Sequence, residues 1–158
     1  MKLAALIAIF ACAGLSEVAA QGGTYTNFSR YYETPAQFEE TSVTLSPYPL
    51  CINKPFCVTL TGNLSTAIIP GAVYQIYGRY LGRLFYSDRD DDLCASLAAA
   101  GTPCPIAIGT NTLTLCRNVK PNLPPNFPVL WYYTATNGDG GVITSQKSNS
   151  VITAKNCS

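Results

Sequence analysis

Histidine is absent from this chain of 158 residues, and charged residues make up only 12% of it. Without an imidazole, the chain cannot build a Ser/His/Asp or Cys/His catalytic site or offer a histidine ligand to a metal. The net charge of +1 is too small for a protein that neutralises the phosphates of a nucleic acid. An enzyme built from this chain would have to work with carboxylates, Tyr, Lys or Ser alone. We expect no nucleic-acid partner, no metal and no cofactor, and we expect that the protein is not an enzyme.

Long apolar runs are also scarce, and the longest one lies at the start of the chain. Lys2 precedes an apolar stretch at 3–15 that is too short to span a bilayer. The small residues at 18–20 suit a signal peptidase, so we expect 1–20 to be a signal peptide cleaved before Gln21. A membrane anchor is the alternative, and its short length disfavours it. The mature chain is then secreted or held in the lumen of a vacuole or endolysosome.

Cysteine, by contrast, is plentiful. Removal of the signal peptide takes away Cys12 and leaves an even number, namely Cys51, Cys57, Cys94, Cys104, Cys116 and Cys157. In an oxidising compartment this predicts three disulfides, for which about 15 pairings exist. Short spacing favours Cys51–Cys57 and Cys94–Cys104, which leaves Cys116–Cys157 as a long-range link. A zinc site is disfavoured because the spacings are not C-x-x-C.

Most of the chain has the pattern of short strands separated by turn residues. Alternating apolar and polar residues predict strands at 38–46, 57–64, 72–80, 83–87, 110–116, 129–136 and 142–155. Asn137-Gly138 predicts a hairpin turn. Residues 93–100 predict a helix, with Asp92 as its N-cap and Gly101 after its end. About seven strands and one short helix predict an all-β, immunoglobulin-like β-sandwich over 38–158.

Residues 21–37 are polar and aromatic and predict an extended or poorly ordered N-terminal arm. Asn27 and Asn63 each begin an Asn-x-Ser sequon, so both are candidate glycosylation sites. A charge run at 88–92 predicts a solvated loop that ends in the helix cap. A calcium loop is disfavoured, because Leu93 and Ala99 occupy the positions where an EF-hand needs Gly and Glu.

Several motifs, in this order and at this spacing, resemble the ML lipid-recognition family over about 38–155. The motifs are Ser46-Pro47 before the first cysteine pair, Pro70-Gly71-Ala72, Gly82-Arg83-Leu84, Asp92-Leu93-Cys94, Cys104-Pro105-Ile106 and the Asn-Gly-Asp-Gly hairpin. The family includes the Niemann–Pick type C sterol carrier, the group 2 mite allergens and the fungal phosphatidylglycerol/phosphatidylinositol transfer proteins, which look most similar. One departure is that no mature cysteine precedes Cys51 and Ser145 stands near the family's last-strand cysteine.

The resemblance implies a secreted monomer that holds a phospholipid or a sterol between its two sheets and moves it between membranes. The inward faces of the strands then supply the cavity: Val58, Leu60, Leu64, Ile68, Ile69, Tyr74, Ile76, Tyr80, Leu84, Tyr86, Val129, Trp131 and Tyr133. Ile68 and Ile69 are also candidates for an apolar lip that touches a membrane transiently. Arg79 and Arg83 are candidate headgroup ligands.

Two alternatives belong to other functional classes. A secreted β-sandwich that binds a protein or a glycan would have a filled core and no lipid cargo. A hydrolase would have to use the carboxylates at 88–92 together with a tyrosine. We rate the hydrolase low, because nothing in the sequence pairs those carboxylates with an acid in a cleft.

Overall fold

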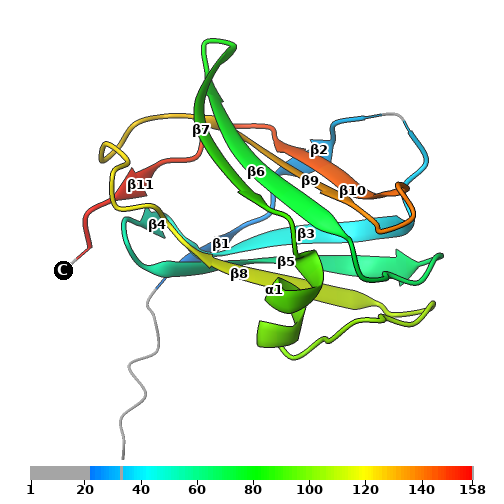
Figure 1. Cartoon of the computed structure of the whole chain (residues 1–158). Helices are drawn as coiled ribbons and strands as arrows, with labels where there is room; N and C mark the ends of the chain where they lie inside the picture. Colours follow the sequence, from blue (N-terminus) through cyan, green and yellow to red (C-terminus); the bar gives the residue numbers. More distant parts are fainter. Residues whose placement is uncertain (1–21, 33, 158) are drawn as a thin grey trace, which may run out of the picture.

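The computed structural model describes residues 22–32 and 34–157, which form a sandwich of two main sheets (Figure 1). The first sheet contains, in spatial order, β1 (Gly23–Tyr25), β3 (Phe38–Tyr48), β5 (Pro55–Leu64) and β8 (Thr112–Asn118). The second contains β2 (Phe28–Arg30), β10 (Val142–Ser148), β9 (Leu130–Thr136), β6 (Val73–Tyr80) and β7 (Arg83–Asp90). A separate parallel pair joins β4 (Leu50–Cys51) to β11 (Ala154–Lys155). The expected signal peptide lies outside the described residues.

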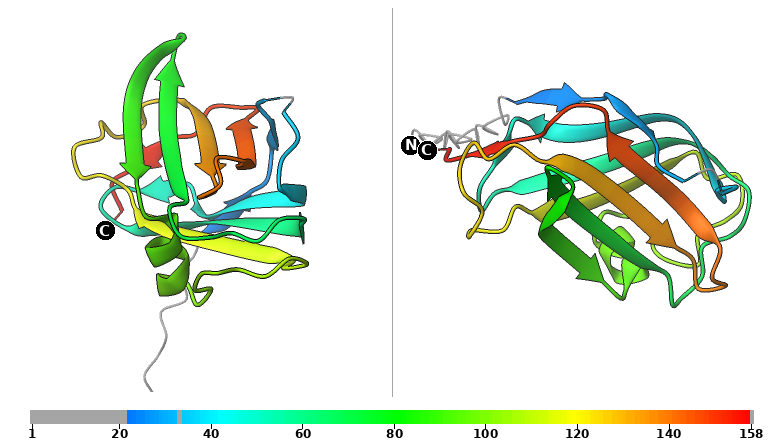
Figure 2. Two further views of the ribbon diagram at one scale, coloured as in Figure 1. Left: turned by 45° about the vertical axis from the view of Figure 1, so that its right-hand side comes forward. Right: turned by 90° about the horizontal axis from the view of Figure 1, so that it is seen from above.

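Seven of the described strands are seven residues or longer, and the other four are short. With one short helix and three disulfides, the predicted all-β sandwich is confirmed. Figure 2 shows the two sheets as layers that face each other, with the β6–β7 hairpin extending beyond them. Among the described residues, no helix is both long enough and apolar enough to cross a bilayer.

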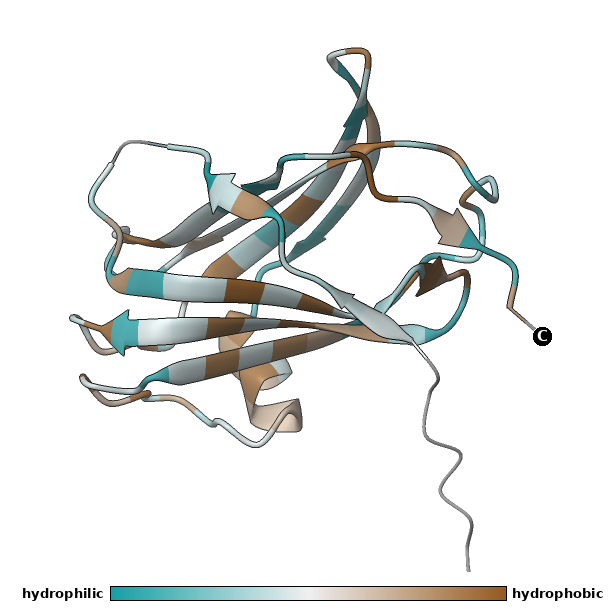
Figure 3. Ribbon diagram, turned by 180° about the vertical axis from the view of Figure 1, so that it is seen from behind, coloured by the Kyte–Doolittle hydropathy of each residue, from teal (hydrophilic) through white to brown (hydrophobic). Residues whose placement is uncertain are grey.

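The alternating pattern of β5 places its apolar side chains between the sheets. Val58, Leu60 and Leu64 are buried, whereas Thr59 and Thr61 lie on the outer face. The Thr59 hydroxyl lies 3.1 Å from that of Thr114 on the neighbouring strand, so the outer face carries polar cross-strand pairs. Figure 3 shows the same alternation of hydrophobic and hydrophilic bands along the strands of this sheet.

The helix α1 (Leu93–Ala99) forms where its capping residues predict it. The Asp92 carboxylate accepts a hydrogen bond of 2.9 Å from the Ala95 main-chain N–H, which is the expected N-cap contact. Leu93 and Leu97 point into the core. Gly101 follows the helix with a φ of 92°, a value that a residue without Cβ adopts at little cost.

The N-terminal arm is more ordered than its composition predicts. β1 pairs with β3 in the first sheet, and β2 pairs with β10 in the second. The Tyr25 hydroxyl adds contacts to the Asn27 carbonyl at 3.0 Å and to the Ser150 hydroxyl at 2.9 Å. The arm therefore crosses from one sheet to the other and is held by backbone pairing, although no cysteine precedes Cys51.

Two of the three predicted disulfides are wrong. Cys94–Cys104 is present, but the other bonds join Cys51 to Cys157 and Cys57 to Cys116. Spacing along the chain gave the wrong pairs because the register of the strands determines which cysteines lie next to each other. Cys57 lies directly opposite Cys116, with their Cα atoms 4.0 Å apart. The parallel pairing of β4 with β11 likewise sets Cys51 opposite Lys155, two residues before Cys157. The pairs Cys51–Cys57 and Cys116–Cys157 are therefore corrected.

The acidic run is only partly a loop. Asp88 and Asp90 lie in β7, and their carboxylates face cations from the first sheet. Arg117 Nη1 lies 3.3 Å from Asp90 Oδ2, and Lys120 Nζ lies 3.3 Å from Asp88 Oδ1. Of the run, only the last two residues follow the strand, and Asp92 caps α1.

Candidate functional site

An apolar cavity of about 30 Å³ lies between the sheets, below the base of the β6–β7 hairpin. Strands of both sheets, the β4–β11 pair and the segment 119–129 enclose it. Its walls are Leu50, Phe56, Phe85, Tyr86, Val119, Leu123, Pro124, Phe127, Val129, Trp131, Ile152, Thr153 and Ala154. Nearly all of these side chains are hydrocarbon or aromatic, so the cavity favours an apolar occupant.

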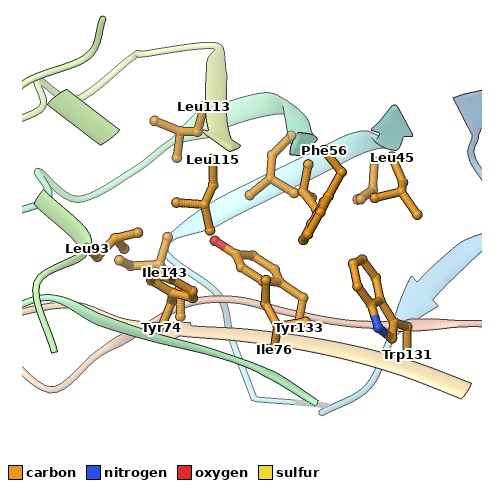
Figure 4. Packing of buried hydrophobic residues seen from close by; sticks show 14 of the residues in the cluster. Leu45, Phe56, Tyr74, Ile76, Leu93, Leu113, Leu115, Trp131, Tyr133 and Ile143 are labelled. Atoms are coloured by element: carbon orange, nitrogen blue, oxygen red, sulfur yellow. The ribbon is translucent and has the colours of Figure 1, made fainter. Parts of the chain in front are cut away.

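Aromatic residues from opposite sheets meet at the inner end of this cavity. The rings of Phe56 and Trp131 are 5.2 Å apart, and Figure 4 shows them facing each other across the gap. Gly78, on β6, lets the Val129 side chain pack close to the strand, because a Cβ there would lie 3.1 Å from Val129 Cγ2 and 3.5 Å from Tyr86 Cβ. A side chain at Gly78 would therefore press on Val129, which is a wall residue.

The outer end of the cavity is covered by an aromatic cluster. The Phe127 ring stacks on the Phe85 ring at 4.0 Å and lies 4.8 Å from the Tyr80 ring. Phe127 belongs to the proline-rich segment 119–129, which contains no strand or helix. The mouth is thus closed by side-chain contacts between a hairpin and a loop, without main-chain pairing between them.

A second void of about 10 Å³ lies deeper in the sandwich, near α1. It is lined by Val58, Leu60, Ile68, Leu93, Leu97, Leu113, Leu115, Tyr133 and Ile143. Figure 4 shows the Tyr133 side chain reaching across the core toward Leu115. Burial raises the pKa of the Tyr133 hydroxyl, which favours its neutral form. The neighbouring Tyr74 hydroxyl is buried without a hydrogen-bond partner among the described residues.

The predicted cavity residues fall into four groups. Three line the first cavity, namely Tyr86, Val129 and Trp131, and four line the second, namely Val58, Leu60, Ile68 and Tyr133. Three more are buried in solid core, namely Leu64, Tyr74 and Ile76. The remaining three are exposed, namely Ile69, Tyr80 and Leu84.

Two of the inward assignments fail because the β6–β7 hairpin extends past the first sheet, so Tyr80 and Leu84 are exposed. A register shift between Gly78 and Arg79 leaves one extra residue, Phe85, in β7, whereas the pairing of β6 with β9 continues to Arg79 without a shift. The lip expected at Ile68 and Ile69 is also incorrect, because Ile68 is fully buried and forms an antiparallel bridge to Ile106.

Several wall residues were not predicted. Phe56 shares the inward face of Val58 and Leu60, and a strand started one residue earlier would have included it. Leu123 and Phe127 lie in the proline-rich segment, where no periodicity marks an inward face. Leu50 and Ile152 reach the cavity wall because segments far apart in the sequence pair with each other. These pairs are β4 with β11, and Val129 with Ile152. No local pattern signals those contacts.

The candidate headgroup residues both lie on the β6–β7 hairpin. Arg79 Nη1 donates a hydrogen bond of 2.8 Å to the Gly82 carbonyl, and its guanidinium lies 5.6 Å from the centre of the Tyr77 ring. Arg83 is exposed at the other side of the turn. Within the described part of the chain, neither cation is paired with a carboxylate.

Ion pairs bridge the sheets along the edge where β7 faces β8. Arg117 and Lys120 contact Asp88 and Asp90, and Lys120 Nζ also donates to the Ser87 carbonyl at 2.8 Å. The Lys120 ammonium lies 5.2 Å from the centre of the Tyr86 ring, in the cavity wall. This edge is closed by side chains alone, since the strand pairings do not join β7 to β8.

Both sequons are accessible. The side chains of Asn27 and Asn63 are exposed, at the arm and on the outer face of β5. Their glycosylation stays a prediction.

Comparison with solved structures shows which folds are similar. A Niemann–Pick type C2 protein from the Japanese carpenter ant has a TM-score of 0.57 at 13% identity, and the match covers 75% of this chain and 98% of that one. The C-terminal domain of Wzt has a TM-score of 0.51 at 11% identity, covering 89% and 81%. Chicken MD-1 complexed with lipid IVa has a TM-score of 0.41 at 12% identity, covering 84% and 99%.

These identities are low enough that the similar structures indicate the fold alone. No curated protein matches the sequence. A family model described as the ML domain matches residues 33–144, which is more than half of the chain. The protein therefore belongs to the ML lipid-recognition family.

Proposed function

We propose that this protein is a secreted, non-enzymatic carrier that holds one lipid between its two sheets and moves it between membranes. The observation that carries the proposal is the apolar cavity at the hairpin side of the sandwich, in a chain of the ML family. Its wall is hydrocarbon and aromatic apart from Tyr86 and Thr153, and the carrier cycle needs no covalent chemistry, because lipid is extracted, shielded and released.

The size of the cavity determines how loading must occur. About 30 Å³ accommodates one or two water molecules, not an acyl chain. The apolar walls of an empty cavity pack together, because side chains that face a gap lose van der Waals contacts. Loading therefore requires the walls to separate, and the side-chain contacts of Phe127 with Phe85 are the natural place.

The energetics permit such an opening. Each methylene moved out of water contributes about 0.8 kcal/mol, so a chain of about twelve methylenes contributes on the order of 10 kcal/mol. Separating a few aromatic pairs costs about 0.5–1.5 kcal/mol each beyond the area they expose. The gain exceeds this cost, and the disulfide between Cys51 and Cys157 keeps the β4–β11 wall in place while the mouth opens.

An anionic phospholipid, such as phosphatidylglycerol or phosphatidylinositol, suits this site better than a sterol. Arg79 and Arg83 stand beside the mouth without a carboxylate partner in the described chain, so an anionic headgroup would find free cations there. The buried hydroxyls of Tyr74 and Tyr133 lie far from those cations, near α1, where a sterol hydroxyl would have to reach.

The test is extraction of the purified protein with organic solvent, followed by mass spectrometry and a transfer assay between vesicles. We expect about one phospholipid per protein in the wild type and much less in Val129→Phe, which fills the cavity. Val151→Phe adds the same bulk at an exposed site outside the wall and should keep its cargo. Ala154→Leu is a second filling variant in case Val129→Phe does not fold.

The small size of both voids favours one rival, a filled sandwich that binds a protein or a glycan through its surface. A wild-type protein that brings no lipid through purification and takes none from vesicles would support that rival. Lipid present in the wild type and lost in Val129→Phe, but not in Val151→Phe, would exclude it.

A further inference from the structure

Exposed apolar side chains gather at the β6–β7 hairpin. Leu81 is 84% exposed, Leu84 59%, and Tyr80 and Phe85 41% each. Leu130, the partner of Arg79 on the adjacent strand, is a further exposed large apolar residue. Figures 1 and 2 show that the hairpin projects away from the sandwich. Tyr80 and Phe85 contact Phe127, whereas Leu81 and Leu84 are the most exposed of these side chains.

The turn at the tip of the hairpin has a backbone conformation that is unfavourable for the leucine it contains. Tyr80 pairs with Arg83, so Leu81 and Gly82 are the two central residues, with φ of 47° and 79°. Two positive φ values define a type I′ turn, where Asn or Gly is preferred and a bulky residue is strained. Neither packing nor turn geometry accounts for a leucine at this position. A leucine there makes sense if its side chain enters an apolar phase outside the protein.

The charges around the tip indicate which apolar phase this is. Arg79 and Arg83 flank the leucine, and the first carboxylate along β7 is Asp88, which is paired with Arg117 and Lys120. Leucine and aromatic side chains with a collar of arginine are typical of segments that lie in the headgroup region of an anionic bilayer. A protein partner would not by itself require unpaired cations beside the apolar tip.

The same hairpin also forms part of the mouth of the cavity. Phe85 lines the cavity and stacks on Phe127, while Leu84 next to it points to solvent. A bilayer that receives the hairpin tip therefore lies next to the aromatic cluster that closes the mouth.

We propose that residues 80–85, the hairpin tip, dock the protein on an anionic phospholipid bilayer, with Leu81 and Leu84 in the apolar region and Arg79 and Arg83 at the phosphates. This replaces the lip expected at Ile68 and Ile69. The proposal extends the carrier function to its membrane step, and its test is independent of the cargo.

The test is co-flotation with vesicles of phosphatidylcholine, with and without phosphatidylglycerol. We expect the wild type to float with the anionic vesicles and to bind less at about 1 M salt than at about 0.15 M. The double variant Leu81→Ser/Leu84→Ser should bind about tenfold or more weakly. Arg83→Gln should bind about fivefold more weakly to the anionic vesicles and should be nearly unchanged on neutral ones.

Ile108→Ser is the matched control. Ile108 is 67% exposed in the connection from α1 to β8, next to Gly109, which bonds to the Leu64 carbonyl at the far end of β5 from Phe56. It should bind vesicles as the wild type does. Equal loss in Ile108→Ser and in the leucine double variant, or no flotation of the wild type, would overturn docking through the hairpin.

Two further measurements separate docking from its alternatives. Light scattering reports whether Leu81→Ser/Leu84→Ser dissociates an oligomer, which would assign the tip to contact between copies of this chain and overturn the proposal. Fluorescence of Trp131, the single tryptophan, reports binding of a short-chain phosphatidylglycerol in the absence of vesicles. Flotation of the wild type without a Trp131 response to the short-chain lipid would contradict the carrier function and support docking. A Trp131 response without flotation would contradict docking and support lipid binding.

Discussion

The sandwich has two ends that are built differently from the same strands. At the helix region, formed by α1 with Ile68 and Ile106, the space between the sheets is covered by a capped helix and a main-chain bridge. At the hairpin region, formed by the hairpin tip and the segment 119–129, it is covered by aromatic side chains. Main-chain hydrogen bonds also tie the segment 119–129 to Ile152 and Ala154, but only side-chain contacts join this segment to the hairpin tip, and rotation of a side chain can break those.

A single polar residue shows how firmly the helix region is fixed. Asn137 is buried, and its Oδ1 accepts the main-chain N–H of Ile69 at 2.9 Å. Its Nδ2 donates to the Gln37 side chain and to the Ala67 carbonyl, both at 2.8 Å. Around Phe127, main-chain hydrogen bonds run from Asn126 to the Ala154 carbonyl and between Val129 and Ile152, so they hold the segment 119–129 to the β4–β11 side and not to the hairpin tip. The contact between the segment and the hairpin tip is therefore the place where we propose that a ligand enters.

The largest difference in stability between the two ends should appear when their disulfides are removed. Cys51–Cys157 closes a loop of 106 residues at the hairpin region, whereas Cys94–Cys104 closes one of 10 at the helix region. Loop-closure entropy predicts losses of about 4.7 and about 2.7 kcal/mol when each pair is replaced by alanine. Urea unfolding of the two double variants measures this. Equal losses would show that native contacts, not loop length, set the contribution of each bond.

Adjacent isoleucines test the packing of the helix region. Ile68 is completely buried and Ile69 is 38% exposed. Ile68→Ala should lower the free energy of unfolding by about 2–5 kcal/mol, and Ile69→Ala by less than about 1 kcal/mol. A larger loss at Ile69 would mean that the helix region is open to solvent and could itself be a mouth.

The layers and the helix that covers one end were predictable from the sequence, while the disulfides and the wall of the hairpin region were not. Alternation placed Val58 and Leu60 inward, and capping placed α1 correctly, because both signals are local. The disulfides and the wall at Leu50 depend on which strands are neighbours, and the sequence of one strand does not carry this information. The exposed position of Tyr80 depends on how far the β6–β7 hairpin extends beyond the first sheet, which no periodicity indicates.

High pH should weaken the core near the helix region. Burial raises the pKa of Tyr74 to about 12 from its ordinary 10.0. The folded protein then keeps this proton between pH 10 and 12 while the unfolded chain loses it, so stability is complete below pH 10 and falls as pH rises. The slope is about 1.4 kcal/mol per pH unit for each such group. Urea unfolding across this range should show a shallower decline in Tyr74→Phe, and an unchanged slope would contradict a buried, protonated hydroxyl.

A small loss of stability should accompany the clearest change in the rate of lipid transfer. Phe127 is half-buried, and its main partner is the Phe85 ring. Phe127→Ala should cost less than about 1.5 kcal/mol of folding free energy, since it removes an aromatic pair at the surface. If that pair must separate before lipid passes, transfer between vesicles should become about two- to tenfold faster.

Tyr32→Ala is the control for that rate. Tyr32 is also an exposed aromatic residue with one close ring partner, Tyr31, but the pair packs on Tyr132 at the outer face of the second sheet. Its loss should leave transfer unchanged. Faster transfer in Tyr32→Ala would indicate a general loosening of the sandwich, and unchanged transfer in Phe127→Ala would place the mouth elsewhere. Faster transfer in Phe127→Ala alone would tie the passage of lipid to the contact between the hairpin tip and the segment 119–129, which side chains make without backbone hydrogen bonds.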